Sequence, residues 1–267
     1  MGDTRQSDVR HLTRLSHTRT NINDGHYLTY KYLFADLEKA TAAYASGRVL
    51  DIGCGNKPYL NWFTPRATQY LGCDIVQSDQ NRVDIISAAT DLPLRENTVD
   101  TVFSTQVIEH VADHRKLLAE AFRVLKPGGY LILSAPMCWE HHEVPHDFFR
   151  FTRYGWQHLL ALTGFTTLEI TANGGKWALV GQMLLNSIHS SFLHRGLRRS
   201  ILRRAYSILR IKWLLNIAFA WLDTADKDEI ATLNFVVVAQ KPKVIAGVAE
   251  RRSPHQAMTP SSISRRA

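Results

Sequence analysis

The sequence predicts an α/β domain built on a mostly parallel sheet, with helices on both faces and a helical insertion before the last strand. Two observations predict this. From Arg48 onward, short apolar runs alternate with helical stretches, which is how a parallel sheet with crossover helices appears in a sequence. Between the last two strand-like runs, residues 174–230 contain further apolar helical stretches. With 267 residues, 45% of them hydrophobic, the chain can bury a sizeable core.

The elements follow in order. Residues 1–24 are polar and predict a flexible N-terminal arm, and residues 26–45 carry Tyr30, Leu33, Phe34 and Leu37 at helical spacing. The first five predicted strands are RVLDI (48–52), YLGCDI (70–75), RVDII (82–86), VDTVFST (99–105) and GYLILSA (129–135).

Two helices and two strands complete the predicted domain over residues 25–242. A helix is predicted over 106–125, ended by the Pro-Gly-Gly run at 127–129, and another after Thr152, a suitable N-cap. FTTLEIT (165–171) and LNFVVVAQ (233–240) are the last strands, and the basic, Ser/Pro/Arg-rich tail 243–267 is predicted to be disordered.

Composition narrows the functional classes. The three cysteines have no CxxC or Cys/His metal spacing, and residues 1–24 lack the apolar core of a signal peptide, so we expect a cytoplasmic protein. The formal net charge is +8, but the excess is concentrated after residue 194. That placement argues against assigning a nucleic-acid substrate from charge alone.

The strongest local signal is a strand that runs into a tight glycine turn, VLDIGCGNK (49–57). Glycine at positions 53 and 55 allows a ligand to approach the backbone closely, although a simple tight turn explains the pattern equally well. Asp74, about 20 residues on, ends the next strand, where such folds place an acid that binds ribose hydroxyls. A nicotinamide fingerprint requires a third glycine at position 58, which here is Pro58.

Several ordered motifs resemble those of class I S-adenosylmethionine-dependent methyltransferases, specifically the methyltransferase type 11 domain family. The motifs are VLDIGCGNKPYL, YLGCDI, DLPLRENTVDTVFSTQVIEHV and RVLKPGGYLILSAP, and the resemblance covers residues 48–170 and returns at LNFVVVAQ. It implies a Rossmann-like seven-stranded sheet whose last strand is antiparallel, and S-adenosylmethionine as cofactor.

The resemblance also implies the cofactor-binding residues. Gly53 and Gly55 would border the methionine and ribose, with Asp51 at the same turn and Asp74 holding the ribose hydroxyls. The family often has Gly-Asp-Ala where this chain has Ser87-Ala88-Ala89, so the acid for the adenine amino group would be Asp91, or backbone groups near Ala89 would replace it. The remaining expected contacts are Cys54, Ile75 and Thr105.

The loop after the fifth strand, residues 136–151, is dense in titratable and aromatic groups at the edge where open α/β sheets bind ligands. Histidine suits a general base for methyl transfer to a protonated nucleophile, so His146 is the first candidate, followed by His142 and Glu143. Alternatively His146 only holds the loop in place. Glu109 and His110 are interpreted as a structural helix turn, and no metal is expected because the run matches no zinc spacing.

The insertion has a cationic stretch without acids, followed by an apolar run too short to span a bilayer. Residues 195–222 predict either a lid helix over the acceptor pocket or an interfacial helix on the inner face of a membrane. The overall hypothesis is a methyltransferase for a small-molecule, glycan or lipid-linked acceptor, with O-methylation preferred. The alternatives are a non-catalytic scaffold with this fold and an RNA methyltransferase, although the chain has no recognisable nucleic-acid-binding module.

Overall fold

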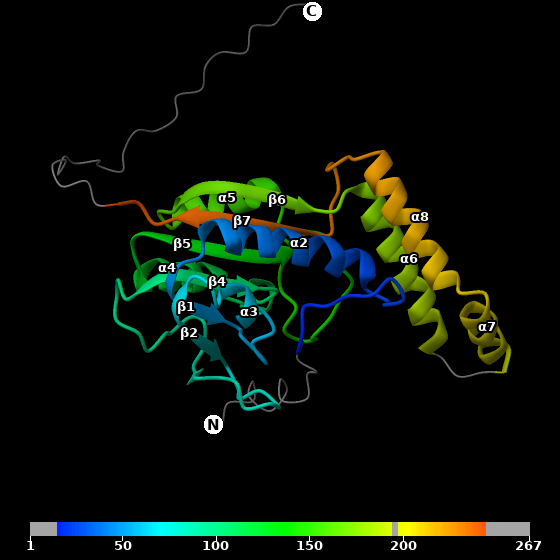
Figure 1. Cartoon of the computed structure of the whole chain (residues 1–267), viewed down its shortest axis with the longest axis horizontal. Coiled ribbons are helices and arrows are strands. Elements are labelled where there is room, and N and C mark those ends of the chain that lie inside the picture. Colours follow the sequence, from blue (N-terminus) through cyan, green and yellow to red (C-terminus); the bar gives the residue numbers. More distant parts are fainter. Residues whose placement is uncertain (1–14, 194–196, 244–267) are drawn as a thin grey trace, which may run out of the picture.

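The computed structural model describes residues 15–193 and 197–243 and places a single seven-stranded sheet at its centre (Figure 1). The strands are β1 (Gly47–Ile52), β2 (Ala67–Asp74), β3 (Ile85–Ile86), β4 (Val99–Thr105), β5 (Leu125–Pro136), β6 (Thr166–Asn173) and β7 (Asn234–Gln240). Their order is β3-β2-β1-β4-β5-β7-β6. Strand β7 runs antiparallel to β5 and β6, whereas the other neighbours pair in parallel, which confirms the predicted fold class.

Helices cover both faces of the sheet. The elements are α2 (Tyr27–Tyr44), α3 (Leu60–Phe63), the 3-10 turn η1 (Ile108–His110), α4 (His114–Val124), α5 (Arg153–Leu162), α6 (Lys176–Leu193), α7 (Leu197–Ile208) and α8 (Ile211–Ala225). Alternate residues of strand β7 pack against the two helical layers. Phe235 and Val237 pack with α4 and α5, whereas Val236 and Val238 pack with α2 and α3. This alternation is expected of a strand buried on both faces.

The predicted helix over 106–125 is wrong in its first half. Gln106 has φ +55°, a left-handed conformation that a right-handed helix excludes. The helix α4 begins only at His114, where the Asp113 carboxylate caps it by accepting a hydrogen bond from the Lys116 amide. It ends at Val124, and β5 begins at once with Leu125, so the Pro-Gly-Gly run lies inside the strand. The result is an irregular segment, 106–113, at the end of β4.

The insertion forms three helices that extend beyond the end of the sheet (Figure 1). The apolar helical stretch predicted over residues 197–222 is divided at Arg210, which has φ +52° and separates α7 from α8. Asp223 of α8 accepts hydrogen bonds from the Gly175 and Ala178 amides and thereby caps α6. Within the described residues, no helix has the combination of length and apolar character that crossing a bilayer requires.

The predicted N-terminal arm falls partly outside the described residues, and its last residues lie against the insertion. Asn216 of α8 donates hydrogen bonds to the carbonyl oxygens of Ile22 and Asp24, at 2.7 and 3.1 Å. Gln182 of α6 donates to the carbonyl of Gly25 at 2.8 Å. The chain is therefore fixed to α6 and α8 just before α2 begins. The predicted C-terminal tail after Lys243 lies outside the described residues.

Candidate active site

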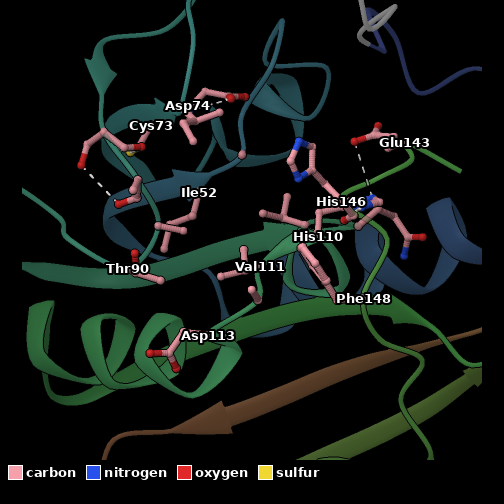
Figure 2. A pocket seen from close by; sticks show the side chains of 18 residues that line it. Ile52, Cys73, Asp74, Thr90, His110, Val111, Asp113, Glu143, His146 and Phe148 are labelled. Atoms are coloured by element: carbon pink, nitrogen blue, oxygen red, sulfur yellow. Dashed lines mark hydrogen bonds and ion pairs between the residues drawn. The ribbon is translucent and has the colours of Figure 1, made fainter. Parts of the chain in front are cut away.

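A cavity of about 290 Å³ lies at the carboxyl ends of β1, β2 and β4 (Figure 2). Open α/β sheets bind ligands at this edge. Its lining residues come from five segments: Ile52, Gly53, Cys73, Asp74, Ile75, Ser87, Ala88, Ala89, Thr90, Gln106, Val107, His110, Val111, Ala112, Asp113, Glu143, His146 and Phe148. In Figure 2, Cys73 and Thr90 lie on one side of the cavity, and Glu143, His146 and Phe148 lie on the other.

The glycine turn after β1 forms one wall. The Gly53 amide donates to the Cys73 carbonyl at 2.8 Å, which ties the turn to the end of β2. Gly53 has φ +76°, and a Cβ at this position would come within 2.2 Å of Val107 Cγ2. Glycine is therefore required here for both conformation and space.

Asp74, the last residue of β2, lies against the same glycine turn, at the strand end that the sequence predicts for it. Its carboxylate accepts hydrogen bonds from the Gly55 amide at 3.0 Å and from the Ile75 amide at 2.8 Å. Its residue exposure is only 5%, yet it lines the cavity. Two backbone hydrogen bonds fix the carboxylate where ribose hydroxyls could donate to it.

Two other residues of the predicted set, Asp51 and Cys54, are buried behind the wall and do not line the cavity. The Tyr70 hydroxyl donates to the Asp51 carboxylate at 2.5 Å. Burial raises the pKa of Asp51 to about 7, against the lowering effect of this hydrogen bond. Burial likewise raises the pKa of the Cys54 thiol, so this cysteine is an inert packing group. Asp51 and Cys54 therefore support the glycine turn from behind.

The two groups predicted to contact adenine, near Ala89 and at Asp91, lie in different positions relative to the cavity. Ala89 lines the cavity together with the rest of segment 87–90, whereas Asp91 is exposed and does not line it. The Asp91 amide donates to the Ala88 carbonyl, and the Asp91 carbonyl accepts from the Ser87 hydroxyl at 2.5 Å. This tight turn directs the Asp91 side chain to solvent. Of the two predicted alternatives, only the segment that contains Ala89 lines the cavity.

Thr105 is not among the lining residues, although it ends β4 as predicted. Its hydroxyl forms a hydrogen bond of 2.5 Å with the Ser134 hydroxyl on β5, and this bond keeps the side chain between the two strands. The next residue, Gln106, lines the cavity instead.

The loop over residues 136–151, called the acceptor loop below, contributes Glu143, His146 and Phe148 to the cavity. The buried Nε2 atom of His146 has no hydrogen-bond partner among the described residues. His142 lies behind His110, with ring centroids 4.7 Å apart, and does not line the cavity. Asp147 pairs with Arg150 at 2.6 Å, and this hydrogen bond lowers the pKa of the Asp147 carboxyl.

Sequence reasoning assigned Glu109 and His110 only a structural role, but His110 lines the cavity. Its Nδ1 atom lies 2.9 Å from the His146 carbonyl, and the Phe148 amide donates to the Glu109 carbonyl at 3.0 Å. These bonds join the η1 turn to the acceptor loop. Burial raises the pKa of the Glu109 carboxyl to about 8 and lowers that of His110. The only sequence signal was their place directly after the end of a strand.

The geometry fits S-adenosylmethionine. The turn at Gly53 has no room for a Cβ, the Asp74 oxygens suit ribose hydroxyls, and Ile52, Val107 and Val111 provide apolar surface. Fold and site thus define a Rossmann-like domain with a ligand cavity at the carboxyl ends of its strands.

The comparisons with known proteins agree. Residues 50–133 match the family model described as "Methyltransferase domain". Over this segment the predicted resemblance to methyltransferases is confirmed.

Curated relatives match about a third of the chain. A "Probable S-adenosylmethionine-dependent methyltransferase" of Mycolicibacterium smegmatis is 36% identical over 33% of this chain and 37% of its own length. A protein of the same description from Mycobacterium tuberculosis is 34% identical over 33% of this chain and 35% of its own length. The chain therefore spans little more than a third of the length of these relatives.

Solved structures share the fold at low sequence identity. The 4+2 cyclase SpnF superposes with a TM-score of 0.55 at 18% identity, covering 89% of this chain and 92% of its own. A SAM-dependent methyltransferase from Archaeoglobus fulgidus superposes with a TM-score of 0.51 at 15% identity, covering 79% of this chain and 94% of its own.

Proposed function

We propose that this protein transfers a methyl group from S-adenosylmethionine to an oxygen atom of a small-molecule, glycan or lipid-linked acceptor. The proposal rests on one observation. A single cavity is lined by Gly53 and Asp74 and also by His146 of the acceptor loop. When bound, S-adenosylmethionine supplies an electrophilic methyl group on a sulfonium.

The residues around the cavity would perform three tasks. Asp74 would orient the ribose, and Phe148 and Val111 would exclude water from the reacting groups. His146, whose Nε2 atom has no partner among the described residues, would take the proton of the acceptor hydroxyl. The acceptor oxygen then bonds to the methyl carbon as the C–S bond breaks, and the bonding electrons remain on sulfur.

Calorimetric titration with S-adenosylmethionine and S-adenosylhomocysteine tests the cofactor assignment. We expect micromolar binding, and at least a tenfold loss in Asp74→Ala, which corresponds to about 1.4 kcal/mol. Asp84→Ala is the matched control, because Asp84 accepts from the Gly72 amide on the same strand but does not line the cavity. NAD should not bind. Equal affinity in wild type and Asp74→Ala would contradict the proposed site.

The cofactor fold does not by itself specify methyl transfer, since one structural neighbour is described as a cyclase. Turnover of labelled S-adenosylmethionine with a panel of hydroxylated acceptors separates an enzyme from the scaffold alternative. His146→Gln should retain cofactor affinity and lose most of the turnover. Cofactor binding without turnover of any acceptor class would favour the scaffold.

We further propose that α7 and α8 contact the anionic inner surface of a membrane. Leu214, Ile217 and Trp221 share one face of α8 and are 52%, 38% and 66% exposed, while Asn216, Ala220 and Asp223 are buried on the other face. Arg203 and Arg204 of α7 are exposed, as is Arg210 just before α8, and Lys212 of α8 is half-buried. Exposed apolar groups beside cations complement anionic lipid headgroups above acyl chains.

Co-sedimentation with vesicles of phosphatidylcholine, with and without phosphatidylglycerol, tests this contact. We expect binding only to the anionic vesicles, lost in the double variant Leu214→Ser/Trp221→Ser and kept in Leu162→Ser, which alters an exposed leucine on α5. Concentration-dependent dimerisation that the double variant abolishes, without vesicle binding, would instead assign this face to a second copy. Steeply salt-dependent RNA binding that the vesicles do not displace would favour the RNA alternative.

A further inference from the structure

Glu109 has a buried carboxylate that accepts no hydrogen bond from any described residue. Its residue exposure is 0%, and neither carboxylate oxygen has a hydrogen-bond partner among the described residues. A buried polar group left unsatisfied costs about 1–3 kcal/mol, and more when it is charged. The Glu109 carboxylate therefore requires either a proton or a bound ligand. The side chains around Glu109 indicate which of the two it has.

Two histidines present ring nitrogens toward this carboxylate. The Nδ1 atom of His110 lies 2.9 Å from the His146 carbonyl, and the Nδ1 atom of His142 lies 3.2 Å from the Glu140 carbonyl. Because a carbonyl only accepts, a proton on each Nδ1 completes these hydrogen bonds, and in the neutral ring the Nε2 atom then keeps its lone pair for a cation. Histidines that bind metals are oriented in this way, by donating the other ring N–H to a carbonyl or carboxylate.

The ligand atoms already form a cluster. One atom from each of Glu109, His110 and His142 lies within 4.8 Å of the others. His110 Nε2 lies 4.0 Å from Glu109 Oε1 and 3.7 Å from an oxygen of Glu143. A tetrahedral zinc site places its ligand atoms about 3.4 Å apart, so small side-chain rotations suffice to close the set around an ion.

We propose that Glu109, His110 and His142 bind a zinc-type divalent cation beside the cavity. Two histidines and one glutamate form the set found in catalytic zinc sites that keep a further coordination position open. Glu143, across from His110, either occupies that position or yields it to an acceptor. Because His110 and Glu143 also line the cavity, the open position would face the acceptor side of the proposed active site.

This inference rests on the proposed function for its role: the cation would bind an acceptor hydroxyl and favour its deprotonation by His146. It differs from the expectation drawn from the sequence that no metal is bound. That expectation considered only the run 136–151, which lacks a zinc spacing. The cluster adds Glu109 and His110 from a segment more than 30 residues earlier, which the bonds between η1 and the acceptor loop bring alongside.

Calorimetric titration of chelator-treated protein with Zn²⁺ tests the site directly. We expect one micromolar or tighter site per chain, weakened by about 100-fold in His142→Ala and in Glu109→Gln. His141→Ala is the matched control, because His141 is the adjacent histidine and its side chain is 92% exposed. If Glu109→Gln fails to fold, His142→Ala, which alters a residue at the edge of the cluster, decides alone.

The outcomes separate this inference from the proposed function. Asp74→Ala should lose S-adenosylmethionine binding and keep Zn²⁺ binding, whereas His142→Ala should do the reverse. Zn²⁺ binding without any cofactor binding would contradict the proposed function and leave the metal site standing. Absence of tight Zn²⁺ binding, or equal losses in His141→Ala and His142→Ala, would overturn the metal site and assign the Glu109 carboxyl a proton.

Discussion

At Gly53 the backbone turns out of β1 into the cavity wall, and the conformation there leaves no substitute for glycine. We expect Gly53→Ala to lower the free energy of unfolding by about 1–3 kcal/mol through its left-handed φ. It should also weaken S-adenosylmethionine binding at least tenfold, because the added Cβ displaces Val107 within the cavity. Urea unfolding and calorimetry measure the two effects.

Gly164→Ala is the control for this substitution. Gly164 has φ +85°, and an added Cβ there would lie 3.3 Å from Phe122, away from the cavity. It should reduce stability without changing cofactor affinity. A similar loss of affinity in both variants would mean that instability, and not the geometry of the wall, weakens binding.

Asp51 predicts a pH dependence of stability. Its pKa is about 7 in the folded protein, against about 4 for an unfolded aspartate, so the folded state keeps the proton longer as pH rises. The carboxyl therefore opposes folding increasingly between pH 4 and pH 7, by about 4 kcal/mol at full effect. Asp51→Asn should gain stability relative to the wild type as pH rises through this window. Denaturant unfolding at pH 5 and pH 8 measures the difference, and a pH-independent difference would contradict the shift.

The position of Asp74 and of the glycine turn followed from the sequence because both lie where a strand ends, and strand ends are marked by apolar runs. The outward direction of Asp91 could not be predicted, because it depends on a hydrogen bond from the Ser87 hydroxyl within one local turn. Nor could the pairing of His110 with the acceptor loop, which depends on backbone contacts between distant segments.

Among the elements, the apolar pattern predicted most strands and the helical character of the insertion, but not its division at Arg210, nor where the segment 106–113 leaves helical geometry. The pattern of Leu117, Leu118 and Ala121 determines one face of α4 and carries no information on its first turn. The Asp113 cap and the left-handed Gln106 set that boundary. Irregular backbone at this point is what brings Val107, His110 and Val111 to the cavity.

The cap of α6 is supplied by another helix, which makes the insertion one cooperative unit. Asp223→Ala removes acceptors for the Gly175 and Ala178 amides, and we expect a loss of about 1–2 kcal/mol in stability with faster hydrogen exchange along α6. Asp226→Ala, at the C-terminal end of α8, should cost less stability, because this side chain is 57% exposed and its contacts with Lys176 and Trp177 lie at the surface. Cofactor affinity should be unchanged in both, since no cavity residue lies in α6 or α8.

At the scale of the whole molecule, the described residues that line the cavity all lie between Ile52 and Phe148, although two more strands and four more helices follow in the chain. Hydrogen exchange with bound S-adenosylhomocysteine should therefore show protection at segments 52–53, 73–75, 87–90, 106–113 and 143–148. The helices α6 to α8 should exchange at unchanged rates. Protection that extends over these helices would indicate that the insertion acts as a lid, the other interpretation of this segment.

The position of β7 has a consequence for synthesis of the chain. Strands β1 to β5 pair with one another in parallel and are complete once Pro136 has left the ribosome. Strand β6 pairs only with β7, which is made some 60 residues later, a delay of about 3–12 s at ordinary rates of translation. The cofactor half of the sheet can thus assemble on the nascent chain, while β6 waits with both edges unpaired until the last strand enters between it and β5.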